Sequence, residues 1–118
     1  MIDSIKRYTR KNNGGTFTPE GVAIFPAMGY AVGGLNYETV HTTLGQEFED
    51  SVLYAMDLAG EFNAFVGTWL DTDTGLWYVD LSRIYKSKER AISQAIAAGE
   101  KAIFDFSTGE SIYVEEVA

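Results

Sequence analysis

Residues 46–62 read QEFEDSVLYAMDLAGEF, and this stretch decides the fold class more than any other part of the chain. At about 100° per residue, its apolar residues fall on a single arc of a helix. These residues are Phe48, Val52, Ala55, Ala59 and Phe62. The opposite arc carries Glu47, Asp50, Tyr54, Asp57 and Glu61. The pattern predicts an amphipathic helix that packs against a sheet and exposes an acidic stripe around one tyrosine.

The segments around this helix have the composition of β-hairpins. Residues 64–70 and 76–81 are rich in aromatic and β-branched residues, and the loop DTDTG joins them. Residues 101–106 and 111–114 predict a second hairpin, with the turn STGE between them. Upstream of the helix, short strands are predicted at 16–18, 22–25 and 29–32, whereas residues 35–45 are expected to be irregular.

A second helix is predicted between Ser87, a suitable N-cap residue, and Gly99, a suitable residue just beyond a helix C-terminus. Its narrow apolar face consists of Ala91, Ile92, Ala95 and Ile96. Helices separated by hairpins predict an α+β fold, a single domain with a mainly antiparallel sheet and two helices packed on it. We expect this domain to span residues 14–118. Residues 1–13 are expected to form a basic segment with the mobility common at chain termini. The alternative for this segment is a short helix with Ile2, Ile5 and Tyr8 on one face.

The composition is that of an ordinary globular protein. The chain has 118 residues, of which 46% are hydrophobic and 22% charged, so a packed core is expected rather than disorder. It contains no cysteine, which excludes disulfides and thiolate metal sites. Residues 1–13 lack the apolar segment of a secretory signal, and no run approaches the roughly 18 apolar residues of a membrane span. We therefore expect a cytoplasmic protein that does not enter a membrane.

The charge distribution is more informative than the net charge of −8. No Lys or Arg occurs from residue 12 to residue 81. The same window holds ten acids, namely Glu20, Glu38, Glu47, Glu49, Asp50, Asp57, Glu61, Asp71, Asp73 and Asp80. Such acidity repels nucleic acid and anionic membranes. Two interpretations remain open: a surface that only keeps the protein in solution, or a face that meets a basic protein partner.

No segment carries a catalytic or metal-binding signature. The loop starting at Asp71 resembles the opening of a calcium loop, but its glycine comes one place early and the twelfth position is Ser82. The loop is therefore interpreted as a hairpin turn. His41 is the sole histidine and has no nucleophile motif around it. The sequence predicts no enzyme, no cofactor and no metal. The chain has two glycine pairs, Gly14-Gly15 and Gly33-Gly34. Neither pair belongs to a phosphate-binding pattern, so both are expected to serve turns.

Several motifs resemble an uncharacterised family of small proteins carried by phages, plasmids and their bacterial hosts. The motifs are GTFTP at 15–19, GYAVGG at 29–34, FVGTWLD at 65–71, YVDLS at 78–82, ERA at 89–91, GEKAIFD at 99–105 and TGE at 108–110. The likeness runs from about Gly14 to Ile112. A second likeness is to antirestriction proteins that mimic DNA, because VGTW at 66–69, Trp77 and a following helix resemble the opening of one of their domains.

These resemblances, together with the charge layout, give two functional hypotheses. The first is an accessory protein of a phage or mobile element that binds a host protein in the bacterial cytoplasm, inhibiting a restriction or CRISPR-type defence enzyme. Its expected contact residues are Glu47, Asp50, Tyr54, Asp57 and Glu61, facing a basic partner surface. The alternative is a structural, assembly or self-associating phage-type domain whose acidity serves solubility. Neither hypothesis fixes the target or the oligomeric state.

Overall fold

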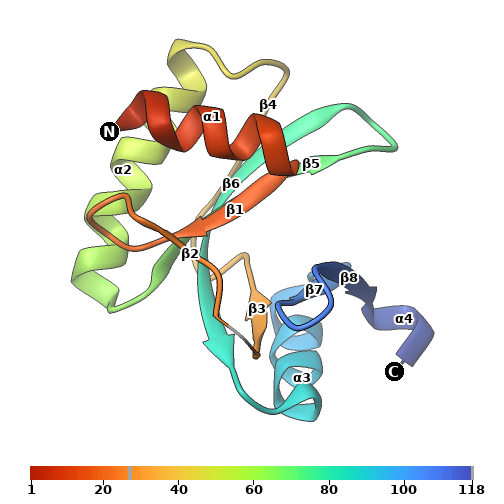
Figure 1. Ribbon diagram of the computed structural model, residues 1–118. Coiled ribbons are helices and arrows are strands. Elements are labelled where there is room, and N and C mark those ends of the chain that lie inside the picture. The colour runs from red at the N-terminus through yellow and green to blue at the C-terminus, as the bar shows by residue number, and fades with distance from the viewer. Residues whose placement is uncertain (27, 118) are drawn as a thin grey trace.

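The computed structural model describes residues 1–26 and 28–117, with side chains as far as residue 115 (Figure 1). The helices are α1 (Ile2–Asn12), α2 (Gln46–Phe62), α3 (Lys88–Ala98) and α4 (Val114–Val117). The strands are β1 (Gly14–Phe17), β2 (Ala23–Ile24), β3 (Tyr30–Val32), β4 (Glu38–His41), β5 (Phe65–Asp71), β6 (Leu76–Tyr85), β7 (Ala102–Asp105) and β8 (Glu110–Tyr113). The α+β class and the antiparallel sheet predicted from the sequence are confirmed.

The sheet is organised around β6, its longest strand. The strand order is β2-β1-β5-β6-β3-β7-β8, and β4 also pairs with β6. One edge of β6 pairs with β5. The other edge pairs with β4 at residues 77–80 and then with β3 at residues 83–85. Between these two partners the chain follows the same edge, because the Leu35 N–H donates to the Leu81 carbonyl and the Leu81 N–H donates to the Tyr37 carbonyl.

The main core lies between the sheet and helices α1 and α2, which cover the same face of the sheet (Figure 1). The predicted stripe of α2 is confirmed for its central members, because Phe48, Val52, Ala55 and Ala59 are completely buried. The prediction was wrong for Phe62, whose side chain is 47% exposed. Phe62 is the last residue of α2, and Asn63 then adopts a left-handed conformation that ends the helix.

Residues 1–13 differ from the mobile segment that was expected. Residues Ile2–Asn12 of this segment form α1, an additional helix that packs on β1, with Ile5 and Thr9 buried. The Thr9 hydroxyl shares a 2.8 Å hydrogen bond with the Thr68 hydroxyl of β5, and Lys6 Nζ lies 2.8 Å from Glu49 Oε2 on α2. The helix stays attached because its apolar face closes the main core, so the folded unit begins before residue 14.

Helix α3 has the boundaries that the capping residues predicted. The Ser87 hydroxyl accepts a hydrogen bond from the Arg90 N–H at 3.2 Å, and Gly99 has φ +73°. Ala91 and Ala95 are completely buried in a second, smaller cluster with Val32. Their small side chains bring the helix close to β3 and β7. Ile96 is 54% exposed, so the buried face is narrower than predicted.

The hairpin of β5 and β6 also forms as predicted. Trp69 and Tyr78 are directly opposite each other and stack with ring centroids 4.6 Å apart. In the turn, Asp71 Oδ1 accepts from the Asp73 N–H at 3.0 Å, as expected of a turn-forming aspartate. The irregular conformation predicted for residues 35–45 was wrong for Glu38–His41, which form β4. No helix among the described residues is long and apolar enough to cross a membrane.

Candidate functional site

The outer surface of α2 carries the residues that the sequence pattern singled out for partner binding. We call Glu47, Asp50, Tyr54, Asp57 and Glu61 the acidic face; all five side chains are exposed. Glu47 and Glu61 are 14 residues apart, so the acidic face extends about 21 Å along the helix at 1.5 Å per residue. The buried stripe on the other side of α2 fixes the helix to the sheet. The acidic face is therefore held on a rigid element.

Tyr54 is the aromatic member of the acidic face. Its side chain is 54% exposed, and its ring lies against Tyr37 with centroids 5.3 Å apart. The Tyr37 hydroxyl in turn shares a 2.7 Å hydrogen bond with the Ser51 hydroxyl of α2. This chain of contacts limits the conformations of Tyr54 while leaving much of its surface accessible to a partner.

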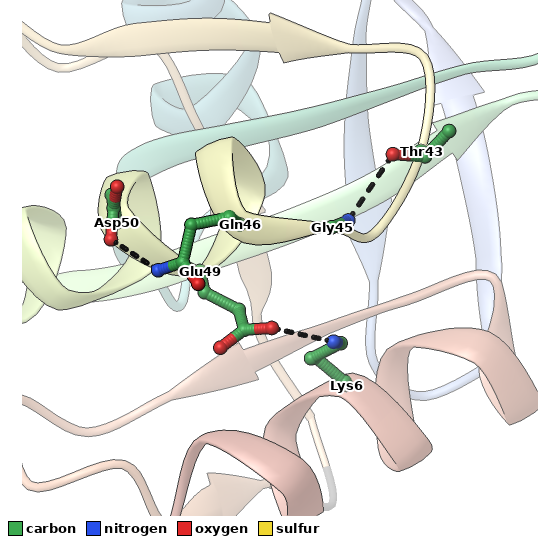
Figure 2. Close-up of polar contacts among 6 residues, drawn as sticks. All are labelled: Lys6, Thr43, Gly45, Gln46, Glu49 and Asp50. Atoms are coloured by element: carbon green, nitrogen blue, oxygen red, sulfur yellow. Dashed lines mark hydrogen bonds and ion pairs between the residues drawn. The ribbon is translucent and has the colours of Figure 1, made fainter.

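Figure 2 shows the polar contacts around the first turns of α2. Gln46 Nε2 donates to Asp50 Oδ1 at 2.8 Å, which orients one carboxylate of the acidic face without neutralising it. Glu49 points to the other side and pairs with Lys6. Among the side chains that the structure describes, Lys6 and Glu49 form the one ion pair, and it includes no member of the acidic face. None of the carboxylates of that face is therefore paired with a basic side chain in the part of the chain that the structure describes.

A second group of acids lies at the strand switch along β6, and the sequence analysis did not single it out. We call Glu38, Asp80 and Glu100 the carboxylate cluster. Glu38 begins β4, Asp80 lies within β6, and Glu100 follows α3 just before β7. One carboxylate oxygen from each lies within 4.8 Å of the others. Acidity is the sole feature that favours a cation there, so we assign no metal to the cluster.

Asp80 is the buried member of the carboxylate cluster, with 3% of its surface exposed. Its Oδ1 accepts a hydrogen bond from the Ser82 hydroxyl at 3.2 Å, and the backbone N–H of Gly34 donates to the same carboxylate. Two glycines make room for it. A β-carbon at Gly67 would come within 3.4 Å of Asp80 Cγ, and one at Gly33 would come within 2.8 Å of the same atom.

This environment changes the protonation of the cluster. Burial raises the pKa of Asp80 well above its ordinary value, and the charges of Glu100 and Glu38 raise it further. The hydrogen bonds from Ser82 and Gly34 act in the opposite direction but do not outweigh burial. Burial also raises the pKa of Glu100, with a smaller contribution from Glu38. The arrangement therefore favours retention of a proton where three carboxylates meet.

Sequence reasoning could have found Asp80 from one signal. Asp80 lies between Val79 and Leu81 in the segment LWYVDL at 76–81, where every other residue is aromatic or apolar. The sequence could not place Glu100 beside Asp80, because Glu100 lies in a turn that is distant from Asp80 along the chain. The glycine pair at 33–34 serves more than turn formation. Gly34 has φ +73°, as a turn requires, but Gly33 is needed for the space it leaves to Asp80.

A shallow cavity of about 250 Å³ lies between the C-terminal part of α3 and the chain that leaves β3. Arg83 and Gln94 provide its polar side chains, together with Asn36. A second cavity, of about 330 Å³, lies between α1 and the segment before β2. Neither cavity is lined by His41 or by a member of the carboxylate cluster.

His41 lies on β4 rather than in a loop. Its Nε2 shares a 2.8 Å hydrogen bond with the Thr39 hydroxyl, and its ring packs edge-on against Phe48 with centroids 5.7 Å apart. Burial lowers the pKa of His41, while the charge of Glu47 partly opposes this effect. The contacts account for His41 as a packed strand residue.

Comparison with known protein families, with curated proteins and with solved structures found no match to this chain. The function is therefore argued from the surface of the molecule itself.

Proposed function

We propose that this chain is a small acidic accessory protein that acts by binding a basic surface of another protein. The observation that carries the proposal is the acidic face, whose four carboxylates are exposed on one side of a packed helix and form no ion pair with any described basic side chain. Tyr54 lies among them and supplies apolar contact area. Binding, rather than catalysis, is the role that such a surface supports.

The most suitable partner is an enzyme that handles nucleic acid, because its cleft is built to attract phosphates. A row of carboxylates on a rigid helix offers negative charges over a distance comparable with several phosphates, which are spaced about 3.4 Å apart along each DNA strand. Opposite charges raise association rates and orient the encounter. The resemblance to DNA-mimicking antirestriction proteins and to phage- and plasmid-borne proteins directs the proposal to restriction or CRISPR-type defence enzymes of a bacterial host.

The experiment that tests this proposal is affinity capture from a bacterial lysate, followed by identification of the captured protein. Capture should occur at low salt and be lost near 1 M salt, because the Debye length falls there to about 3 Å. If the captured protein is a nuclease, this chain should slow its cleavage of DNA in proportion to the amount added. Capture that is unchanged at high salt, or a captured nuclease that cleaves at its full rate, would refute the proposed mechanism.

One observation favours the alternative of a self-associating or assembly domain. Large apolar side chains are exposed just before and just after β2 in the sequence. Val22, which precedes the strand, is 60% exposed, and Phe25 and Met28, which follow it, are 57% and 66% exposed. β2 pairs with β1 on one side and has no strand on the other among the described residues. Sedimentation at increasing protein concentration distinguishes the two ideas. A dimer that Phe25→Ser abolishes would support assembly, whereas a monomer throughout would leave the acidic face as the better candidate.

A further inference from the structure

The carboxylate cluster lies at a structural junction. Asp80 is located where the edge of β6 changes its partner from β4 to β3, and the connecting residues 33–37 bridge this change. Glu38 is the first residue of β4, whereas Glu100 lies in the turn that leads into β7. Gly34 contacts both acids, since its N–H donates to Asp80 and a β-carbon there would come within 2.8 Å of Glu100 Cδ. Three segments of the chain therefore meet at one group of acids.

Among the described residues, no basic side chain balances this group. The charged groups that face Asp80 are Glu38 from β4 and Glu100 from the turn before β7. The adjacent position on β5 is Gly67, and the loop after β3 contributes Gly33 and Gly34, none of which carries a charge. Ser82, on the same face of β6, provides a hydroxyl donor. Three negative charges at this spacing would repel one another at a buried position, where water screens them poorly.

We propose that Glu38, Asp80 and Glu100 form a proton-dependent latch, which holds the loop after β3 and the start of β7 against β6 when protonated and loosens this junction when its proton is released. The device does not depend on the acidic face or on its partner. It is built from the buried position of Asp80, the proximity of the three carboxylates and the glycines that pack against them.

The direction of the pH effect follows from the shifted pKa values. The unfolded chain releases the proton of Asp80 near pH 4, the ordinary value for aspartate, whereas the folded protein keeps it to a higher pH. Between these two pKa values the folded state binds more protons, so stability falls as the pH rises. Glu100 has a raised pKa as well and acts in the same direction. The contribution to stability is therefore fully present below the ordinary pKa of aspartate near 4, and it is lost as the pH rises through the raised pKa of the folded state.

The test compares urea unfolding of the wild type with that of Asp80→Asn from about pH 5 to pH 9. Between the unfolded-state and folded-state pKa values, unfolding releases one proton from the latch. The equilibrium constant for unfolding therefore increases up to about tenfold per pH unit in this range. The Asn side chain has nearly the same shape and does not ionise, so this part of the pH dependence should vanish. Asp73→Asn is the matched control, because Asp73 is exposed at the tip of the β5–β6 hairpin, and its pH dependence should follow the wild type.

Loosening of the junction is measured by hydrogen exchange, corrected for the intrinsic effect of pH on the exchange rate. The Leu35 and Leu81 amides bridge the strand switch. Their protection should fall with rising pH in the wild type and stay constant in Asp80→Asn, while amides between β1 and β5 show no such change. Parallel unfolding curves for wild type and Asp80→Asn would overturn the proposal. If Asp80→Asn does not fold, Glu38→Gln decides, because removing this exposed charge must shift the pH dependence, and an unshifted curve refutes the latch.

Discussion

The α-carbon of Gly33 lies so close to Asp80 that a β-carbon at residue 33 would come within 2.8 Å of the Asp80 Cγ atom. Gly33 therefore allows a carboxylate to be buried where β6 changes its partner. This contact joins the two parts of the sheet, since Gly33 directly follows β3 and Asp80 pairs with the first residue of β4.

Gly33→Ala should destabilise the protein by about 1–3 kcal/mol, the usual cost of an added group in a packed site. The matched control is Gly60→Ala on α2, where the nearest atom would be Pro19 Cβ at 3.8 Å. Alanine is the better helix former, so this control should stabilise by about 0.5–1 kcal/mol. Urea unfolding of the two variants and the wild type measures both changes in the free energy of unfolding. A Gly33→Ala variant as stable as the wild type would show that Asp80 can move away at no cost.

The hydrogen bond between Thr9 and Thr68 attaches α1 to β5 inside the core. Thr9→Val leaves the Thr68 hydroxyl buried without a partner, which should cost about 1–3 kcal/mol. The double variant with Thr68→Val removes both hydroxyls and should recover much of that loss. Urea unfolding of the two single variants and the double variant gives the coupling energy. Additive losses would contradict a hydrogen bond between these side chains.

Ile5→Ala tests whether α1 belongs to the folded unit. Because Ile5 is 1% exposed, this truncation should cost about 2–5 kcal/mol through lost burial and the cavity left behind. Ile96→Ala makes the same chemical change at a side chain that is 54% exposed and should have little effect. Thermal or urea unfolding measures both. Equal stability of the two variants would mean that residues 1–13 are detached in solution.

The pKa of Asp105 should be shifted in the opposite direction from the pKa of Asp80. The Ser107 hydroxyl donates to Asp105 Oδ1 at 2.7 Å, and this hydrogen bond lowers the pKa of Asp105. A lowered folded-state pKa contributes stability that is present above the ordinary value near 4 and is lost as the pH falls below it. Carboxyl NMR titration should place Asp105 below and Asp80 above that value, and Ser107→Ala should raise the pKa of Asp105. The reverse order of the two residues would contradict the structure.

The sequence predicted most of the elements whose signals are local. The stripe of α2 repeats at helical spacing, and Ser87 and Gly99 mark the ends of α3, so these elements lie where they were expected. β4 was missed because Glu38–His41 has a mixed composition and is stabilised by pairing with β6. For α1, the three apolar residues Ile2, Ile5 and Tyr8 were too few to favour a helix over a mobile terminus, because the sequence does not show the core on which they pack.

The same distinction applies to the two groups of acids. The acidic face follows one helix, so its members could be placed together by counting residues. The carboxylate cluster depends on contacts between β4, β6 and the turn after α3, and such contacts leave no periodic pattern. Asp80 looked like a solvated charge in the sequence, although it is buried where Gly33 and Gly67 pack against its carboxylate.

The central claim is that the acidic face binds a basic protein surface, and charge reversal tests it most directly. The variant changes Glu47, Asp50, Asp57 and Glu61 to Lys, and the control changes Glu20, Asp73, Glu89 and Glu110, which are also exposed, to Lys. Each exchange adds two charges, so four exchanges bring both proteins from −8 to zero. Exposed substitutions usually alter stability by no more than about 0.5 kcal/mol, so both variants should keep the parent's far-UV spectrum.

The decisive measurement is capture of the partner from a bacterial lysate by the parent and by these two variants at low salt. The account predicts that reversal on α2 abolishes capture, whereas the control variant captures the same protein as the parent. Equal capture by all three proteins would contradict the account, and so would equal loss in both variants, because the effect would then follow net charge rather than the acidic face.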